Sequence, residues 1–123
     1  MNVFEQNVKV LGADYKITVK GYSDEKQFEE NSWAGWCCEY TREIVLCDLK
    51  TWPGWEKEQA EKIDACMKKT LRHEITHAFF YESGLHEDSA TIESGWACNE
   101  EMVDWFAAQG PKIYKAWKEV GAI

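Results

Sequence analysis

His-Glu-Ile-Thr-His, residues 73–77, lies near the end of the longest helical pattern in the chain. Apolar residues that recur about every 3.6 positions predict a helix from about Glu56 to Ser83, with Gly84 at its end. The apolar face of this helix consists of Ala60, Met67, Leu71, Ile75 and Ala78. His73 and His77 lie on a different face, so we expect the apolar face to pack on a core while the histidines face a cleft.

Each fixed position of this H-E-x-x-H pattern has a chemical role. Two histidines four residues apart fall on one side of a helix, so His73 and His77 can bind one metal ion through neutral imidazole nitrogens. Glu74 is then directed at a metal-bound water rather than at the metal, where it can accept the proton of that water as a general base. The motif therefore predicts one zinc ion (Zn2+) per chain, with Glu74 as the catalytic residue.

A third metal ligand is needed, because a catalytic zinc site usually has three protein ligands and one position for water. The best candidate is Glu100, in an acidic segment downstream of the histidines. Asp104 lies one helical turn further on, where it can accept a hydrogen bond from the outer nitrogen of a ligating histidine. Glu101 is an alternative ligand if this helix is rotated by one residue, and Cys98 and His86 are further alternatives.

The composition indicates one globular domain and excludes several classes of function. A chain of 123 residues, 45% of them hydrophobic and 29% charged, is long enough for a single buried core. The net charge is -8 and the Lys and Arg residues form no run, so we expect no nucleic-acid partner. No stretch is both apolar enough and long enough to cross a bilayer, so we expect no membrane partner either.

Cysteine usage and the first residues indicate a cytoplasmic protein. The segment Met1–Val10 alternates polar and apolar residues and includes Glu5 and Lys9, which is not typical of a signal peptide. The five cysteines are odd in number, and Cys37 and Cys38 are adjacent. Reduced thiols in a cytosol fit this pattern better than a disulfide framework does.

Two hairpins are predicted in the N-terminal half. Val3–Leu11 and Tyr15–Lys20 have strand patterns and are joined by a turn at residues 12–14. Trp36–Tyr40 and Glu43–Cys47 form the second hairpin. Between the two hairpins, the polar residues 21–32 predict a loop or a short helix.

The C-terminal half is predicted to be helical. A second helix covers about Ser94–Gln109, Gly110 and Pro111 end it, and a short third helix covers Lys112–Val120. Because the strands come first and the helices last, the order favours an α+β fold. We expect a small N-terminal antiparallel sheet of hairpins that packs on the long H-E-x-x-H helix and on a second, ligand-bearing helix.

Together the two motifs resemble the gluzincin pattern of thermolysin-like zinc peptidases, in which H-E-x-x-H is followed by N-E-x-x-x-D, here residues 99–104. The resemblance implies a zincin-like fold, with Glu100 as the third ligand and Asp104 as the support of a histidine. Arg72–Leu85 and Gly95–Lys112 are also similar to the small ImmA/IrrE-like proteins encoded by phages and prophages. That similarity implies a cytoplasmic setting in a bacterial host or a phage-infected cell.

The expected function is a zinc-dependent peptidase that hydrolyses a peptide bond of a peptide or protein substrate through a metal-activated water. The alternative is a zinc-bound regulatory or binding module that keeps the site but has little turnover. His86, Tyr81 and Tyr40 are candidates for the group that stabilises the oxyanion. The resemblance further implies that Glu43–Cys47 lies along the cleft as a sheet edge, to which an extended peptide could add as a strand.

Overall fold

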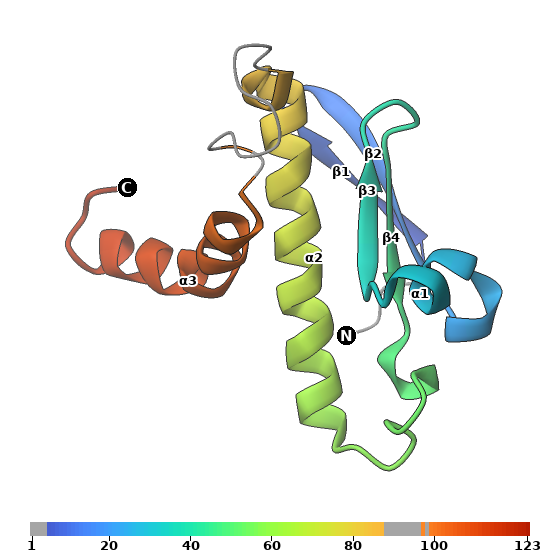
Figure 1. The fold of residues 1–123 in the computed structure, drawn as a ribbon. Helices are drawn as coiled ribbons and strands as arrows, with labels where there is room; N and C mark the ends of the chain where they lie inside the picture. Colours follow the sequence, from blue (N-terminus) through green and yellow to red (C-terminus); the bar gives the residue numbers. More distant parts are fainter. Residues whose placement is uncertain (1–4, 88–96, 98) are drawn as a thin grey trace.

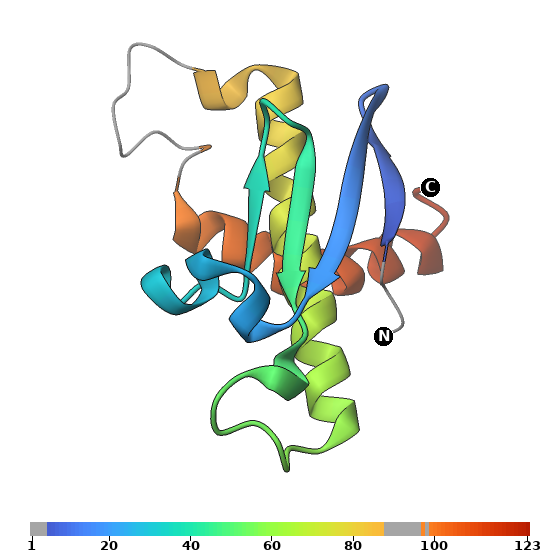
Figure 2. The ribbon, with the colours of Figure 1, turned by 90° about the vertical axis from the view of Figure 1, so that its right-hand side faces the viewer.

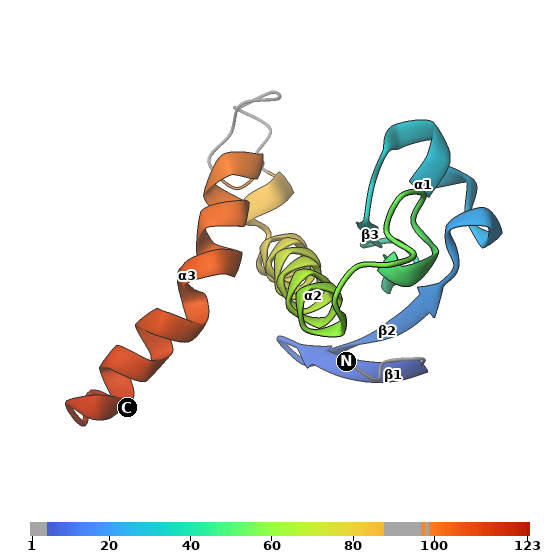
Figure 3. The same ribbon diagram turned by 90° about the horizontal axis from the view of Figure 1, so that it is seen from below.

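The computed structural model describes residues 5–87, 97 and 99–123, which form an α+β fold (Figure 1). Its strands are β1 (Glu5–Val10), β2 (Ala13–Lys20), β3 (Gly35–Cys38) and β4 (Glu43–Cys47), and its α-helices are α1 (Lys26–Asn31), α2 (Ala60–Ser83) and α3 (Glu100–Glu119). Short 3-10 turns occur at Tyr22–Asp24, Leu49–Thr51 and Leu85–Glu87. Seen along α2, the sheet lies on one side of that helix and α3 on the other (Figure 3). Among the described residues, no helix has the length and apolar character that a membrane span requires.

The sheet is mixed, so the prediction of a purely antiparallel sheet is wrong. Both hairpins form, because β1 pairs antiparallel with β2 and β3 pairs antiparallel with β4. The hairpins are joined by a parallel pairing of β2 with β4, in which Ile17 lies opposite Ile44 (Figure 2). Turn residues determine a hairpin locally, whereas the way two hairpins join depends on the chain that crosses between them, which here includes α1.

The order β1-β2-β4-β3 makes β4 an inner strand and β3 an edge strand. The expectation that Glu43–Cys47 forms the sheet edge is therefore wrong. Successive residues of β4 are buried on opposite faces, with Ile44 and Leu46 in one core cluster and Val45 and Cys47 in the other. This continuous burial is typical of an inner strand covered on both faces.

The first hairpin turns at Leu11 and Gly12, which have φ angles of 50° and 88°. Val10 pairs with Ala13, so only two residues connect the strands, and Ala13 and Asp14 belong to β2 rather than to the predicted turn at residues 12–14. Two consecutive residues with positive φ are what a tight two-residue hairpin turn requires.

Helix α2 covers the sheet with much of the predicted apolar face. Met67 and Ala78 are buried, and Leu71 and Ile75 are partly buried against a core cluster. Ala60 is instead the exposed first residue of the helix. The helix begins four residues later than predicted, because a turn precedes it, in which the amide of Glu58 donates to the carbonyl of Trp55. It ends as predicted, with Gly84 in the left-handed region at φ 85°.

Helix α3 runs without a break from Glu100 to Glu119, so the predicted end at Gly110 and Pro111 is wrong. Proline lacks the amide that would donate to the carbonyl four residues earlier, which here is Ala107. That carbonyl instead accepts a hydrogen bond of 2.6 Å from Nε of Arg72. A side chain from α2 therefore satisfies the acceptor that Pro111 leaves, and the helix continues past the proline. Residues 94–96 and 98 of the predicted helix lie outside the described residues, and Asn99 is the N-cap of α3 rather than part of the helix.

Candidate metal centre

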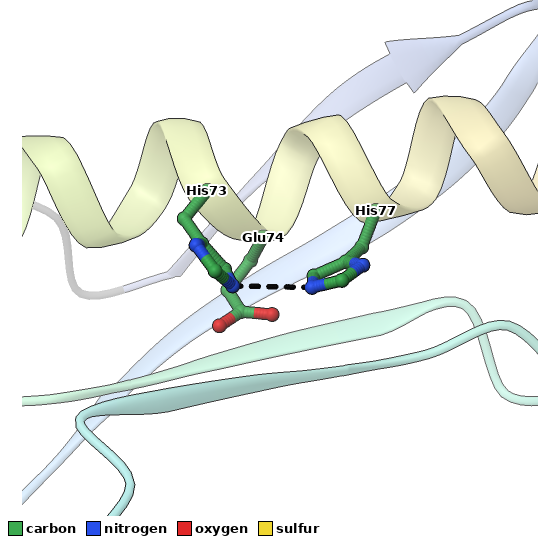
Figure 4. Close-up of side chains that lie close together, drawn as sticks. All are labelled: His73, Glu74 and His77. Carbon is green, nitrogen blue, oxygen red and sulfur yellow. Dashed lines mark hydrogen bonds between the residues drawn. The ribbon is translucent and has the colours of Figure 1, made fainter. Parts of the chain in front are cut away.

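His73, Glu74 and His77 project from one side of α2 toward the sheet (Figure 4). Because the histidines are one helical turn apart, their rings are neighbours and meet edge-on, with the ring centroids 4.7 Å apart and the two Nε2 atoms 3.1 Å apart. The ligand atoms of these three residues all lie within 4.8 Å of one another, so the group could hold a metal ion.

Glu100, the first residue of α3, brings a carboxylate to the two histidines. Its side-chain oxygens lie 3.2 Å from Nε2 of His73 and 3.0 Å from Nε2 of His77. Zinc ligands at roughly 2.0–2.1 Å in a tetrahedron lie roughly 3.3–3.4 Å from one another. Two imidazole nitrogens and one carboxylate at these separations therefore form a donor set that fits a tetrahedral zinc ion.

Asp104 lies behind His73, on the side away from this donor set. Its Oδ1 is 2.7 Å from Nδ1 of His73. We assign the Nδ1 proton to His73 because a carboxylate only accepts hydrogen bonds. The lone pair of Nε2 is then free for a metal, and the ring is held in one orientation. The helical spacing had predicted this placement of Glu100 and Asp104 on one face of their helix.

His77 is the more buried of the two histidines. Burial is the largest cause that lowers the pKa of His77, so its imidazole favours the neutral form, and neutral imidazole binds zinc. Its Nδ1 is buried and has no hydrogen-bond partner among the described residues. The two ligands thus differ, because only His73 has a carboxylate at its outer nitrogen.

Glu74 is 6% exposed and lies beside the histidines without being the closest carboxylate to them. Burial raises the pKa of Glu74 to about 7, His73 opposes that rise, and the carboxylates of Glu100 and Asp104 add to it. A divalent cation in the donor set would favour the ionised form again. Glu74 is thus a buried carboxyl group whose proton affinity suits proton transfer near neutral pH.

Of the other candidate ligands, Glu101 lies apart from the cavity that the histidines line, and His86 lies on its wall. Glu101 lines a separate hollow, together with Asn99, Met102 and Trp105. His86 lines the cavity in front of the two histidines, where its ring packs edge-on against Tyr81 at a centroid distance of 4.3 Å. Cys98 lies outside the described residues.

An open cavity of about 470 Å³ lies in front of the two histidines. Tyr81 and His86 line it, whereas Tyr40 is 86% exposed and is not among the lining residues. The Tyr81 ring stacks on the His77 ring, with the ring centroids 6.2 Å apart. Burial raises the pKa of the Tyr81 hydroxyl, so this hydroxyl keeps its proton and can donate a hydrogen bond. The structure therefore keeps two of the three oxyanion candidates beside the centre.

The edge strand β3 forms the opposite wall of the cavity, through Gly35, Trp36 and Cys37. A Cβ atom on Gly35 would lie 3.0 Å from Cγ2 of Thr70 and 3.1 Å from the carbonyl oxygen of Val45. Glycine at this position therefore lets β3 approach α2 closely, directly beside the histidines.

Arg72 is a contributor to the site that the sequence analysis missed. Its hydrogen bond to the Ala107 carbonyl joins α2 to α3 next to the histidines, and Val103 and Ala107 of α3 are buried nearby. These contacts position the turn of α3 that carries Glu100 and Asp104. The sequence signal would have been a proline inside an otherwise helical pattern, which leaves a carbonyl that needs another donor.

Comparisons with known proteins add no family to this description. No protein-family model matches the chain, no curated protein matches it, and no solved structure matches it. The description of the site therefore comes from its geometry and from the H-E-x-x-H and N-E-x-x-x-D patterns.

Proposed function

We propose that this chain is a zinc-dependent peptidase with a zincin-like arrangement of its two ligand-bearing helices. The observation that carries the proposal is the convergence of three donors, from His73, His77 and Glu100, at separations of 3.0–3.2 Å. Asp104 at the outer nitrogen of His73 and the buried Glu74 beside the donors add to it. A structural zinc site needs neither an open cavity nor a base, and both are present here.

Bound zinc would polarise the substrate carbonyl and lower the pKa of a water. Glu74 would accept a proton from a water in the cavity and pass it to the leaving amine, a role that its burial beside the donor set supports. Tyr81 and His86 lie on the cavity wall, where a donor can stabilise the oxyanion of the tetrahedral intermediate. Asp104 keeps the His73 ring in place while charge develops.

The substrate class that fits the cavity is an extended peptide. Since β3 is the sheet edge and lines the cavity, a peptide segment can pair with it as an added strand and pass in front of the histidines. Main-chain hydrogen bonds would then hold the scissile carbonyl near the metal without a requirement for one side chain. The resemblance to ImmA/IrrE-like proteins supports a bacterial or phage-infected cytoplasm as the setting of this activity.

Metal analysis tests the centre. Protein purified without added metal should contain about one zinc per chain, and His73→Ala and Glu100→Ala should each lower this occupancy sharply. Glu101→Ala is the matched control, because Glu101 neighbours Glu100 but lines another hollow. Full zinc occupancy in both the His73 and Glu100 variants would contradict the proposed ligands.

Glu74→Gln tests whether the centre is catalytic. The amide fills the same space but cannot take a proton from water at neutral pH, so zinc and fold should be retained while hydrolysis is lost. Wild type and Glu74→Gln can be incubated with a proteome-derived peptide library, and new termini counted by mass spectrometry. If no cleavage depends on Glu74 while both proteins bind zinc and capture the same partner, the chain is a zinc-bound binding module.

A further inference from the structure

A second hollow lies beside the metal centre, between α2 and the turn that precedes it. We propose that this hollow binds a large apolar side chain of the substrate, aromatic by preference, two or three residues away from the cleaved bond. The inference rests on the peptidase function proposed above and adds to it the class of sequence that is cleaved.

Five of the seven residues that line this hollow are apolar or aromatic, and the other two, Ser32 and Thr70, carry hydroxyl groups. The hollow has a volume of about 320 Å³, and its lining includes Trp52, Trp55, Leu49, Ala34 and Cys66. None of its lining residues is charged, although 29% of the chain is charged. A charged side chain placed there would lose its hydration without gaining a partner, whereas an apolar one would gain from burial.

The walls are held in place by contacts of their own. Trp52 packs edge-on against Tyr22 with the ring centroids 4.9 Å apart, and Nζ of Lys62 lies 5.0 Å from the centre of the Trp55 ring. The hydroxyl of Thr70 donates to the Cys66 carbonyl at 2.9 Å, so this lining residue already has a hydrogen-bond partner. A hollow whose walls are already ordered binds a side chain with a smaller loss of entropy.

A third hollow lies between this one and the candidate metal centre. It has a volume of about 490 Å³, shares Ser32, Ala34, Cys66 and Thr70 with the second hollow, and is also lined by His73 and Glu74. The three hollows therefore follow one another along α2, with the histidines near one end of this path and the tryptophans at the other.

The length of this path gives the position of the bound side chain. Cys66 precedes His73 by seven residues on α2 and Thr70 precedes it by three, which places them roughly 10 Å and 4.5 Å along the helix from His73. An extended peptide advances about 3.3 Å per residue. The side chain that enters between Thr70 and Cys66 is therefore two or three residues from the carbonyl at the metal. Since ligand pockets range from roughly 300 to 1,000 Å³, a hollow of about 320 Å³ suits one large side chain.

Binding can be measured without turnover, on the full chain loaded with zinc. N-acetyl-L-phenylalaninamide should shift the indole N–H signals of Trp52 and Trp55 in a nitrogen–proton correlation spectrum, and N-acetyl-L-glutamic acid amide should not. Cys66→Leu fills the hollow and should lower the affinity for N-acetyl-L-phenylalaninamide at least tenfold. Trp55→Ala removes one wall of the hollow and should lower this affinity as well, which keeps the test valid if Cys66→Leu fails to fold. Trp117→Ala, a loss of tryptophan at the far end of α3, should leave binding unchanged.

Equal shifts with both probes, or shifts that neither Cys66→Leu nor Trp55→Ala weakens, would overturn the proposal. Cleavage of the proteome-derived peptide library then measures how far the bound side chain lies from the cleaved bond. Wild type should cleave peptides with Phe, Trp, Tyr, Leu or Met enriched at one site two or three residues from the cut, and Cys66→Leu should reverse that enrichment in favour of smaller residues.

The failures of the two proposals are distinguishable. Cleavage that depends on Glu74 but shows no such enrichment overturns the apolar subsite and leaves the peptidase function. Shifts of Trp52 and Trp55 without any cleavage that depends on Glu74 overturn the peptidase function and leave an apolar binding site. The absence of both results overturns both.

Discussion

The two helices that meet at the candidate site are held in different ways. Helix α2 lies between the sheet and α3 and has buried residues along much of its length, including both Glu74 and His77. Among the described residues of α3, only Val103 and Ala107 are buried, and the carboxylates of Glu100 and Asp104 are 64% and 60% exposed. The histidines are thus fixed by the core, whereas the carboxylates depend on how α3 packs on α2.

The two halves of α3 also differ in how closely they pack on α2. The half that carries the site packs on α2, while the C-terminal half leads away from α2 (Figure 3). Tyr114 and Trp117 in that half are exposed. A few contacts near Ala107 therefore hold the carboxylates of α3 beside the histidines of α2.

Truncation of the core under α2 should have the largest effect. Ile44→Ala removes a fully buried side chain of β4, so we expect the free energy of unfolding to fall by about 2–5 kcal/mol. Val120→Ala, at the 80% exposed residue that follows α3, should change this free energy by less than about 0.5 kcal/mol. Urea denaturation followed by circular dichroism measures both. Equal losses of unfolding free energy in the two variants would contradict the difference between the core under α2 and the exposed end of the chain after α3.

Arg72→Met should weaken the junction between the helices. The Ala107 carbonyl loses its donor, so we expect a loss of about 1–3 kcal/mol in the free energy of unfolding, together with weaker zinc binding. Pro111→Ala restores a backbone amide four residues after Ala107, so Arg72→Met should cost less in that background. Lys68→Met is the control, because Lys68 is an exposed lysine of α2 that pairs with Asp64. The same loss with and without Pro111 would show that Arg72 does not replace the missing amide.

Asp104→Ala tests the support of His73. We expect zinc affinity to fall about 10- to 100-fold, the usual size of such a loss, with little change in unfolding because the side chain is exposed. Competition with a chromophoric zinc chelator measures the affinity, and Glu101→Ala serves as the control on the same turn of α3. An affinity equal to that of wild type would remove the supporting role of Asp104.

Glu82 should make a smaller, pH-dependent contribution on the sheet side of α2. The Tyr15 hydroxyl donates to Glu82 at 2.8 Å and Arg42 pairs with it, and these two partners lower the pKa of Glu82. A lowered folded-state pKa gives stability that is present above the unfolded value, about 4.3, and is lost as pH falls through the folded value. The Tm difference between wild type and Glu82→Gln should therefore shrink from pH 6 to pH 3. Glu30→Gln on α1 is the control, and a difference that is constant with pH would contradict the ion pair.

Local patterns were enough to predict several elements. The spacing of His73 and His77 on a helix, the end of α2 at Gly84 and the two hairpins follow from the periodicity of side chains and from turn chemistry, which act over a few residues. Even there, the first turn consists of Leu11 and Gly12 rather than residues 12–14, because the positive φ of a non-glycine residue such as Leu11 is not apparent from its type.

Local patterns failed where distant segments decide. The parallel pairing of β2 with β4 depends on the path of the chain through α1, and it made β3 rather than β4 the edge beside the cavity. Pro111 predicted the end of a helix, and the helix continues because Arg72, 39 positions earlier in the sequence, donates to the free carbonyl. Pro111 signals that a carbonyl of α3 needs another donor, but nothing within either helix identifies Arg72 as that donor.

The sequence by itself determined which side chains could form a metal centre, since a helix places residues four apart on one side whatever surrounds it. It placed His73 and His77 on one side of one helix and Glu100 and Asp104 on one side of another, while Glu101, Cys98 and His86 stayed open as alternative ligands. Only the tertiary structure decided that these two pairs meet, with the Glu100 oxygens 3.0–3.2 Å from both Nε2 atoms and Asp104 behind His73. The physical reason is that the packing of α3 on α2 and the approach of β3 at Gly35 depend on contacts between residues far apart in the chain.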